Sequence, residues 1–135
     1  MTRAEVHDVE PDPMRAREFL EQARRFLQDA EVESLSLASS CILLYQSCVA
    51  AMDAILTKAG RTVGYGEFAH VTRINEALRL AGGAYSELFA RIGDEWRVER
   101  GEVSYGAVAP SAAMVAAQHD DAREVVALAG RVLAT

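Results

Sequence analysis

Apolar residues recur along most of the chain at intervals of three and four, the spacing that gathers them on one face of an α-helix. No segment shows the alternation or the hairpin signals of a strand. Short connections favour antiparallel neighbours, so we expect an all-α fold, an antiparallel up-and-down helical bundle of four long helices plus one shorter helix. The first expected helix begins at Asp12-Pro13, and the second runs from Ser34 or Ser36 to Lys58. The third runs from about Glu67 to Ala81, the fourth from the Gly82-Gly83 pair past Trp96, and the fifth from Pro110 to the C-terminus.

The helix expected to end at Lys58 is apolar around most of its circumference. Asp53 is its only charge before Lys58, and such a helix must be surrounded, either by its own bundle or by a second subunit. The apolar run is long enough to raise the question of a membrane span, but serines, Gln46 and Asp53 interrupt it, and basic residues do not flank both ends. We therefore expect a buried central helix and no membrane partner.

The beginning of the chain differs from the rest. Residues 1–11 are polar and aperiodic, which predicts a flexible N-terminal arm. Asp12 followed by Pro13 is typical of a helix start, with an N-cap and a proline in the first turn. Residues 12–135 are thus expected to form one helical domain. Charged side chains fill the solvent side of its first helix, namely Arg15, Arg17, Glu18, Glu21, Arg24 and Arg25.

Composition limits what such a domain can do. The chain has 135 residues, 14 of them basic and 20 acidic, and its net charge is -6. An acidic domain repels phosphate backbones at long range, which counts against a generic DNA binder. Cys41 and Cys48 lie seven residues apart on one helix, about 10 Å along its axis, and cannot bridge each other. With no secretory signal at the start, two thiols of this kind indicate a reducing, cytoplasmic location.

His70 is the histidine with the most suggestive spacing. Glu67 and His70 are three residues apart, as in the carboxylate-histidine pairs of di-iron bundles, but such a site needs a second copy of the pair, and the sequence has none. We therefore predict no metal site and keep His70 as a hydrogen-bonded or ligand-binding residue. The glycine loops, nucleophile elbows and zinc spacings of common enzyme classes are missing from the sequence as well, and no cofactor is expected.

The segment from Arg97 to Tyr105 offers the most specific clue. Arg97 and Arg100 lie one turn apart near a helix end, beside Trp96 and Tyr105. One interpretation is a ligand site in which the two guanidiniums bind a phosphate or a partner's carboxylate and Tyr105 supplies a hydroxyl or a stacking face. The other is a local salt-bridge cluster with Glu99 and Glu102, whose tyrosine tethers the following loop.

Together with the helices before it, this segment resembles the HEPN superfamily of small helical bundles, and looks most like an actinobacterial branch of it. Members carry an arginine, a polar residue, a few variable positions and a histidine at the end of a late helix. Here Arg100 and Tyr105 bound that pattern, with four residues between them and tyrosine in place of histidine. Tyr45 with residues 50–56 is similar to the family's central helix, and residues 68–70 to the start of the next helix.

The resemblance, which covers about residues 12–134, implies a homodimer whose late-helix arginines face each other across a cleft. In active members it implies a metal-independent ribonuclease, in which arginine stabilises the phosphate and histidine moves the proton of the 2′-hydroxyl. Tyrosine, with an ordinary pKa of about 10, is a poor base at neutral pH, and Gly101 replaces a polar orienting residue. His70 or His119 could replace the lost base only within hydrogen-bonding reach of Arg100.

Three functions follow from these observations. The leading hypothesis is a HEPN-like dimeric module that binds RNA, a nucleotide or a protein partner through Arg97, Arg100, Tyr105 and His70, with Arg100 and Tyr105 as the remnant of the catalytic pair. The second is an active ribonuclease toxin, controlled by an antitoxin. The third is a non-catalytic interaction domain whose apolar central helix pairs with another protein.

Overall fold

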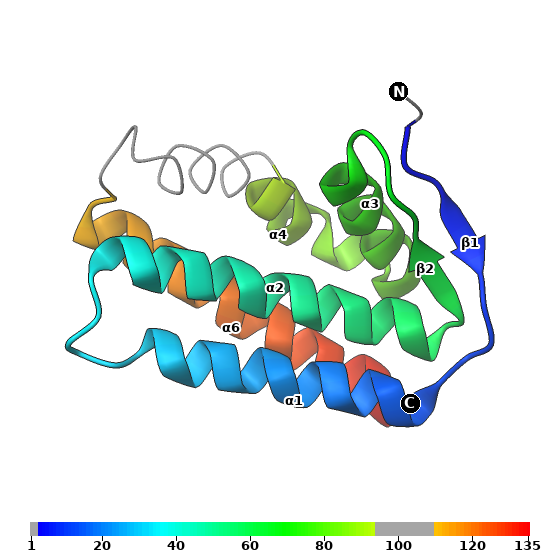
Figure 1. Cartoon of the computed structure of the whole chain (residues 1–135), viewed down its shortest axis with the longest axis horizontal. Coiled ribbons are helices and arrows are strands. Elements are labelled where there is room, and N and C mark those ends of the chain that lie inside the picture. Colours follow the sequence, from blue (N-terminus) through cyan, green and yellow to red (C-terminus); the bar gives the residue numbers. More distant parts are fainter. Residues whose placement is uncertain (1–2, 94–109) are drawn as a thin grey trace.

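The computed structural model describes residues 3–93 and 110–135 (Figure 1). This part of the chain is mostly helical, which confirms the predicted all-α character. The elements are β1 (Val6–Asp8), α1 (Pro13–Ala30), α2 (Leu37–Lys58), β2 (Arg61–Val63), α3 (Ala69–Ala81), the 3-10 turn η1 (Gly83–Tyr85), α4 (Ser86–Arg91) and α6 (Ala112–Ala134).

Helix α2 is the centre of the arrangement. It packs against α1, α6 and α3, and Figure 1 shows α1 running antiparallel beside it, α6 behind both, and α3 and α4 along its opposite edge. Three of the helices are long, with 18 residues in α1, 22 in α2 and 23 in α6. The expected continuation of the fourth helix past Trp96 lies outside the described residues.

The helix starts follow from capping side chains. The Asp12 carboxylate accepts a hydrogen bond from the backbone N–H of Arg15 at 2.9 Å, and the Ser36 hydroxyl accepts one from Ser39 at 3.1 Å. These caps confirm the predicted starts of α1 and α2, since each satisfies a backbone donor that the first helical turn leaves unpaired. Helix α3 begins at Ala69, two residues later than expected, because Phe68 adopts a left-handed backbone with φ 59°.

The core confirms α2 as a buried helix. Leu44, Ala51 and Ala54 have no exposed surface, and Ile55 and Leu56 have almost none. By length and composition alone Leu37–Lys58 could cross a membrane, but 67% of its most apolar window is buried inside the chain. Burial of this extent fits the core helix of a bundle, in which other helices supply the apolar surroundings.

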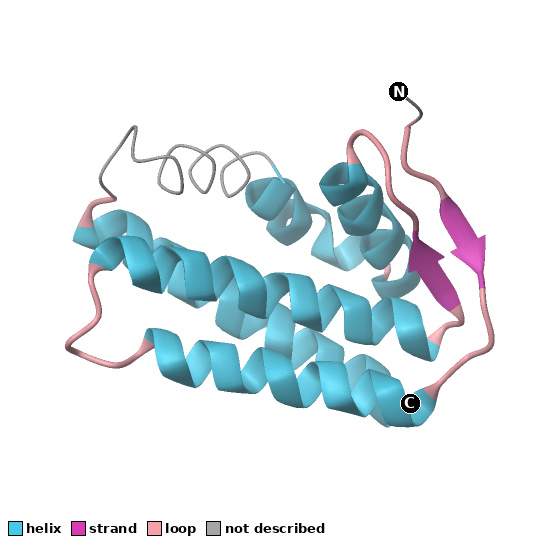
Figure 2. Ribbon diagram, in the orientation of Figure 1, coloured by secondary structure: helices cyan, strands magenta, loops and turns pink. Residues whose placement is uncertain are grey.

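A small sheet lies at one end of the bundle. The prediction that no strand occurs is therefore wrong. Val6, His7 and Asp8 pair antiparallel with Val63, Thr62 and Arg61 (Figure 2). Each strand has only three residues, too few for period-two alternation to appear in the sequence. Strand β1 lies in the segment expected to be a loose arm, and Ala4 just before it is 5% exposed.

Gly60 makes the close approach of this strand to α2 possible. It has φ 74°, in the left-handed region, and follows the C-cap of α2. Its carbonyl accepts a hydrogen bond from Val9 at 2.9 Å. A Cβ at this position would lie 2.6 Å from the Val9 carbonyl oxygen, so only glycine fits without movement of the chain.

The far ends of α2 and α6 meet at Lys58. Its ammonium donates to the carbonyl of Val132 at 2.5 Å, to the carbonyl of Thr135 at 2.7 Å and to the Thr135 hydroxyl at 3.0 Å. The last carbonyls of a helix have no partners within the helix. Lys58 supplies partners for the end of α6.

Candidate functional site

The predicted site is only partly described. Arg97, Arg100 and Tyr105 all fall within residues 94–109 and lie outside the described part of the chain. His70 is described, as the second residue of α3. His119, the other histidine considered, lies on α6, where its Nε2 is 2.9 Å from a Glu31 carboxylate oxygen.

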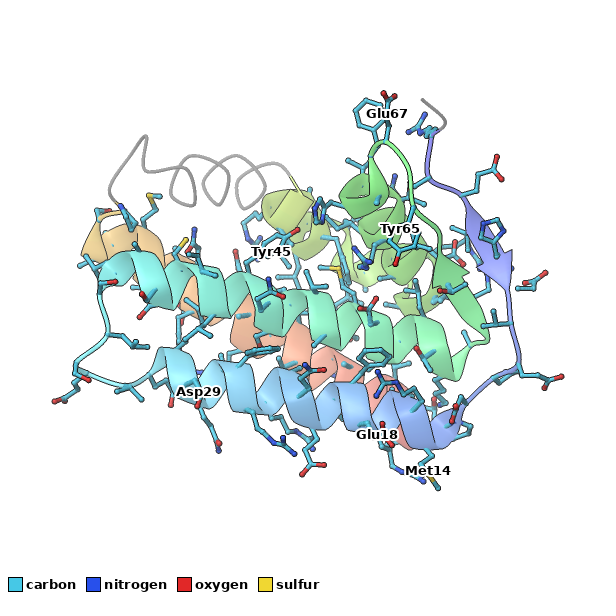
Figure 3. The ribbon with its side chains drawn as sticks, in the orientation of Figure 1. Met14, Glu18, Asp29, Tyr45, Tyr65 and Glu67 are labelled. Carbon is cyan, nitrogen blue, oxygen red and sulfur yellow. The ribbon has the colours of Figure 1, made fainter. Side chains whose placement is uncertain are left out.

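His70 is held by a buried tyrosine from the central helix. The Tyr45 hydroxyl lies 2.5 Å from His70 Nδ1, and the two rings meet edge to face with centroids 5.6 Å apart. Tyr45 is only 7% exposed, whereas His70 is exposed. Figure 3 shows Tyr45 on the side of α2 that faces α4 and α3. A hydroxyl that hydrogen-bonds one ring nitrogen fixes the orientation of the imidazole.

The space around this pair is nearly filled. The cavity between α2 and α3 that Tyr45, His70, Cys48 and Ile74 help to line holds only about 10 Å³, too little for a ligand. The Tyr45–His70 contact therefore fixes an exposed ring against the core, and a ligand at His70 would lie on the surface of the molecule.

An ion pair lies next on the same side of α2. Arg73 Nε donates to Asp53 at 3.0 Å. Burial raises the pKa of Asp53, and Arg73 opposes that rise by charge and hydrogen bonding. The pair explains how the only charge in the apolar part of α2 is tolerated.

Two arginines surround Glu76 and join α3 to the sheet. Glu76 is 7% exposed, and its carboxylate accepts hydrogen bonds from Arg79 and, at 3.1 Å, from Arg61. Arg61 also pairs with Asp8 on β1. The hydrogen bond from Arg79, with a further contribution from Arg61, holds the pKa of Glu76 below its usual range although burial opposes it. This network is structural, because its charges satisfy one another.

The core also contains a carboxylate and two thiols. Asp121 on α6 is 9% exposed and pairs with Arg91 at 3.2 Å. Cys41 and Cys48 are buried thiols that are not bridged to each other, and their spacing predicted that they could not be. Burial, with a contribution from the Asp121 charge, raises the pKa of the Cys48 thiol well above its ordinary value, which disfavours the reactive thiolate. Within residues 3–93 and 110–135, no group of three His, Cys, Asp or Glu side chains could hold a metal ion.

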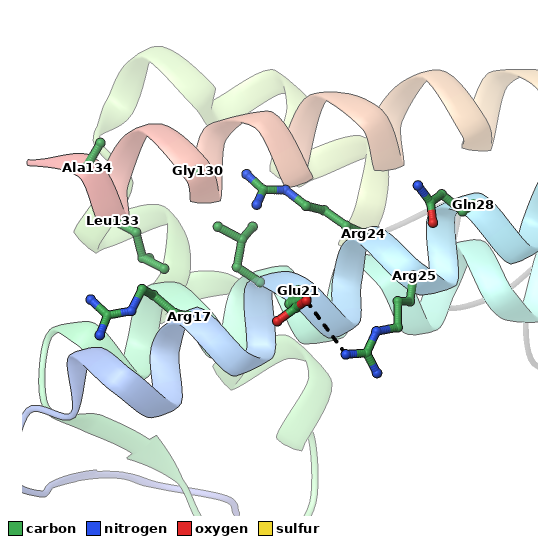
Figure 4. Close-up of a pocket in the computed structure, with 9 residues that line it drawn as sticks. Arg17, Glu21, Arg24, Arg25, Gln28, Gly130, Leu133 and Ala134 are labelled. Carbon is green, nitrogen blue, oxygen red and sulfur yellow. Dashed lines mark ion pairs between the residues drawn. The ribbon is translucent and has the colours of Figure 1, made fainter.

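A groove of about 680 Å³ lies between α1 and α6. Figure 4 shows Arg24 reaching from α1 towards Gly130 on α6, Arg17 near Leu133, and Glu21 beside Arg25. The Glu21 and Arg25 side chains are 3.8 Å apart. Sequence reasoning placed these arginines on the solvent side of α1 but missed the groove. The seven-residue spacing of Arg17 and Arg24, which puts them on one face, is the signal that could have indicated it.

Comparison of the chain with models of known protein families, with characterised proteins and with solved structures gives no match.

Proposed function

We propose that this chain is a cytoplasmic, HEPN-like homodimeric module that binds RNA without cleaving it and needs no cofactor. The proposal includes a bundle of four long helices and one shorter one. The observation that carries it is the contact between Tyr45 and His70. These residues come from two of the helical stretches on which the resemblance rests, 25 positions apart, and their contact supports the proposal by joining those stretches.

The chemistry of the proposed site favours binding over catalysis. Arg97 and Arg100 would contact phosphates through their guanidinium forks, and Tyr105 would stack on a base. His70, oriented by Tyr45, would add a polar contact at the surface. Position 105 carries a tyrosine, whose high ordinary pKa leaves almost none of it as a base at neutral pH. Arginine alone stabilises a charged phosphate but moves no proton.

A half-buried stripe on α2 supports the homodimer. Leu43, Gln46, Val49 and Asp53 follow one another at helical spacing and are all partly exposed. Gln46, Val49 and Asp53 line shallow pockets together with Phe19 or Phe26 of α1. Both phenylalanines are also partly exposed. In Figure 1, α6 lies behind α1 and α2 and covers one side of this pair. A stripe of this kind suits a second subunit, because pairing two copies would bury it.

The test is RNA binding in a metal-free buffer, followed by fluorescence anisotropy of a labelled single-stranded oligonucleotide. We expect saturable binding that Arg100→Ala weakens at least tenfold and Arg123→Ala leaves unchanged. Arg123 is a suitable control because it is an exposed arginine on α6, and both variants remove one positive charge. Equal loss of affinity in the two variants would reduce the binding to nonspecific charge attraction.

The same samples test the competing functions. Intact RNA on a denaturing gel after incubation is the expected result, whereas cleavage that Arg100→Ala abolishes would establish an active ribonuclease. Light scattering coupled to size exclusion should give twice the chain's mass. A monomer that binds no RNA would contradict the proposal and favour an interaction domain for another protein.

A further inference from the structure

Two arginines in the groove between α1 and α6 stand out from the other arginines. Arg17 and Arg24 are exposed and make no hydrogen bond or ion pair within residues 3–93 and 110–135. The other described arginines each pair with a carboxylate or contact an aromatic side chain. In a chain of net charge -6, two unpaired guanidiniums lining one cavity are a local exception.

The charge of the groove is positive overall. Three arginines line it against a single carboxylate, that of Glu21, which lies 3.8 Å from Arg25. The end of α6 nearby would oppose an anion, because the carbonyls of a helix C-terminus carry partial negative charge. Lys58 offsets that effect, since its ammonium already binds the carbonyls of Val132 and Thr135.

Gly130 on α6 lies opposite Arg24 across the groove. A Cβ at Gly130 would lie 3.4 Å from Arg24 Nη2, so even the smallest side chain would touch the guanidinium at this point. Glycine inside a helix is unfavourable relative to alanine, and no left-handed backbone explains it, because Gly130 is in regular α6. Glycine leaves open a space beside the guanidinium that an added Cβ would fill in ordinary van der Waals contact.

We propose that this groove binds the phosphate groups of a nucleotide. Arg17 and Arg24 are two helical turns apart, about 10 Å along α1, so together they reach more than one phosphate. Guanidinium forks match phosphate oxygens in pairs. The groove volume of about 680 Å³ lies in the range of sites for small ligands. The site is separate from Arg97, Arg100 and Tyr105 in sequence and does not depend on the proposed RNA-binding function.

The experiment is calorimetric titration of the full chain with ATP as the nucleoside triphosphate, in a chelator-containing buffer. We expect saturable binding of ATP that weakens at least tenfold in the double variant Arg17→Gln/Arg24→Gln. Gln28→Glu should weaken it comparably, because Gln28 lines the groove and the change adds a negative charge with almost no change in shape. Arg123→Gln, which removes a positive charge from the exposed side of α6, should bind like the parent.

Additional ligands distinguish the sources of the phosphate. Inorganic phosphate should bind more weakly than ATP, because one phosphate cannot reach both arginines. A short RNA that binds in place of ATP, and that the double variant no longer binds, would assign the groove to strand phosphates. Binding of neither ATP nor RNA, or equal binding by the parent and the double variant, would overturn the proposal. Circular dichroism spectra of all variants should match the parent, since the substituted side chains are exposed.

Discussion

Replacing Gly60 with alanine tests how tightly the N-terminal strand is held against α2. The substitution has two separate costs. Gly60 has φ 74°, and a non-glycine residue in the left-handed region is disfavoured by roughly 1–2 kcal/mol. The new Cβ would also lie 2.6 Å from the Val9 carbonyl oxygen and 3.0 Å from Pro11 Cγ. Overpacking of this kind costs about 1–3 kcal/mol, while alanine recovers roughly 0.4–1 kcal/mol through the unfolded chain.

We therefore expect Gly60→Ala to lower the free energy of unfolding by about 2–4 kcal/mol. Equilibrium urea denaturation followed by circular dichroism measures the loss. With an m-value of roughly 1–3 kcal/mol/M, the midpoint should fall by at least about 0.7 M. Gly83→Ala is the matched control, because Gly83 has no positive φ and a Cβ added there would meet no atom of the described residues within 4 Å.

Gly60→Asn separates the two costs. Asparagine enters the left-handed region more readily than alanine, but its Cβ meets the same Val9 oxygen. A stability midway between the parent and Gly60→Ala is the expected result. If Gly60→Asn were as stable as the parent, the steric part of the reasoning would be refuted, and if Gly60→Ala cost less than Gly83→Ala, both parts would fail.

Three further predictions concern buried polar groups. Glu76→Gln should lower the free energy of unfolding by about 1–3 kcal/mol at pH 7. Because the pKa of Glu76 is lowered in the folded state, this difference from the parent should persist above about pH 4.5 and vanish as the pH falls through the folded-state pKa. Urea midpoints measured across the pH range would show it. Ser47→Ala should cost about 1 kcal/mol by the same assay, because the fully buried Ser47 hydroxyl donates to a backbone carbonyl of α1 at 2.7 Å. A thiol reagent should leave Cys48 unmodified in the native protein and modify it in urea, because burial raises the pKa of that thiol; fast modification of the folded chain would contradict its burial.

The helices could be predicted from sequence because their signals are local. Asp12 and Ser36 cap within three residues of themselves, and the apolar residues of α2 read as buried whatever surrounds them. The sheet could not be predicted, because Val6 pairs with Val63 across more than fifty residues and neither strand is long enough to show a period. The same limit applies to buried charges: Glu76 looks like an ordinary solvent-facing residue until Arg61 is placed beside it.

In the candidate site, too, local features could be predicted from the sequence, whereas contacts between distant residues could not. The importance of His70 could be suspected from sequence, but its partner could not, since Tyr45 reads as one more apolar position of the central helix and only folding brings it to the imidazole. Arg17 and Arg24 were recognised as solvent-facing, and they are exposed. The sequence does not show that α6 packs beside them and forms the other wall of the groove. Whether a charged helix face is open surface or one wall of a groove depends on where α6 ends.

Lys58 has a consequence for how the bundle tolerates its own helix dipoles. In Figure 1, α2 and α6 run in the same direction, so their negatively polarised ends lie at the same end of the molecule. Lys58 is the last residue of α2, and its ammonium reaches the last carbonyls of α6. One positive charge thus serves two like-oriented helices. A modification that neutralises this lysine, such as acetylation, would remove that charge from both ends at once and leave Arg131 as the basic residue in the last turn of α6.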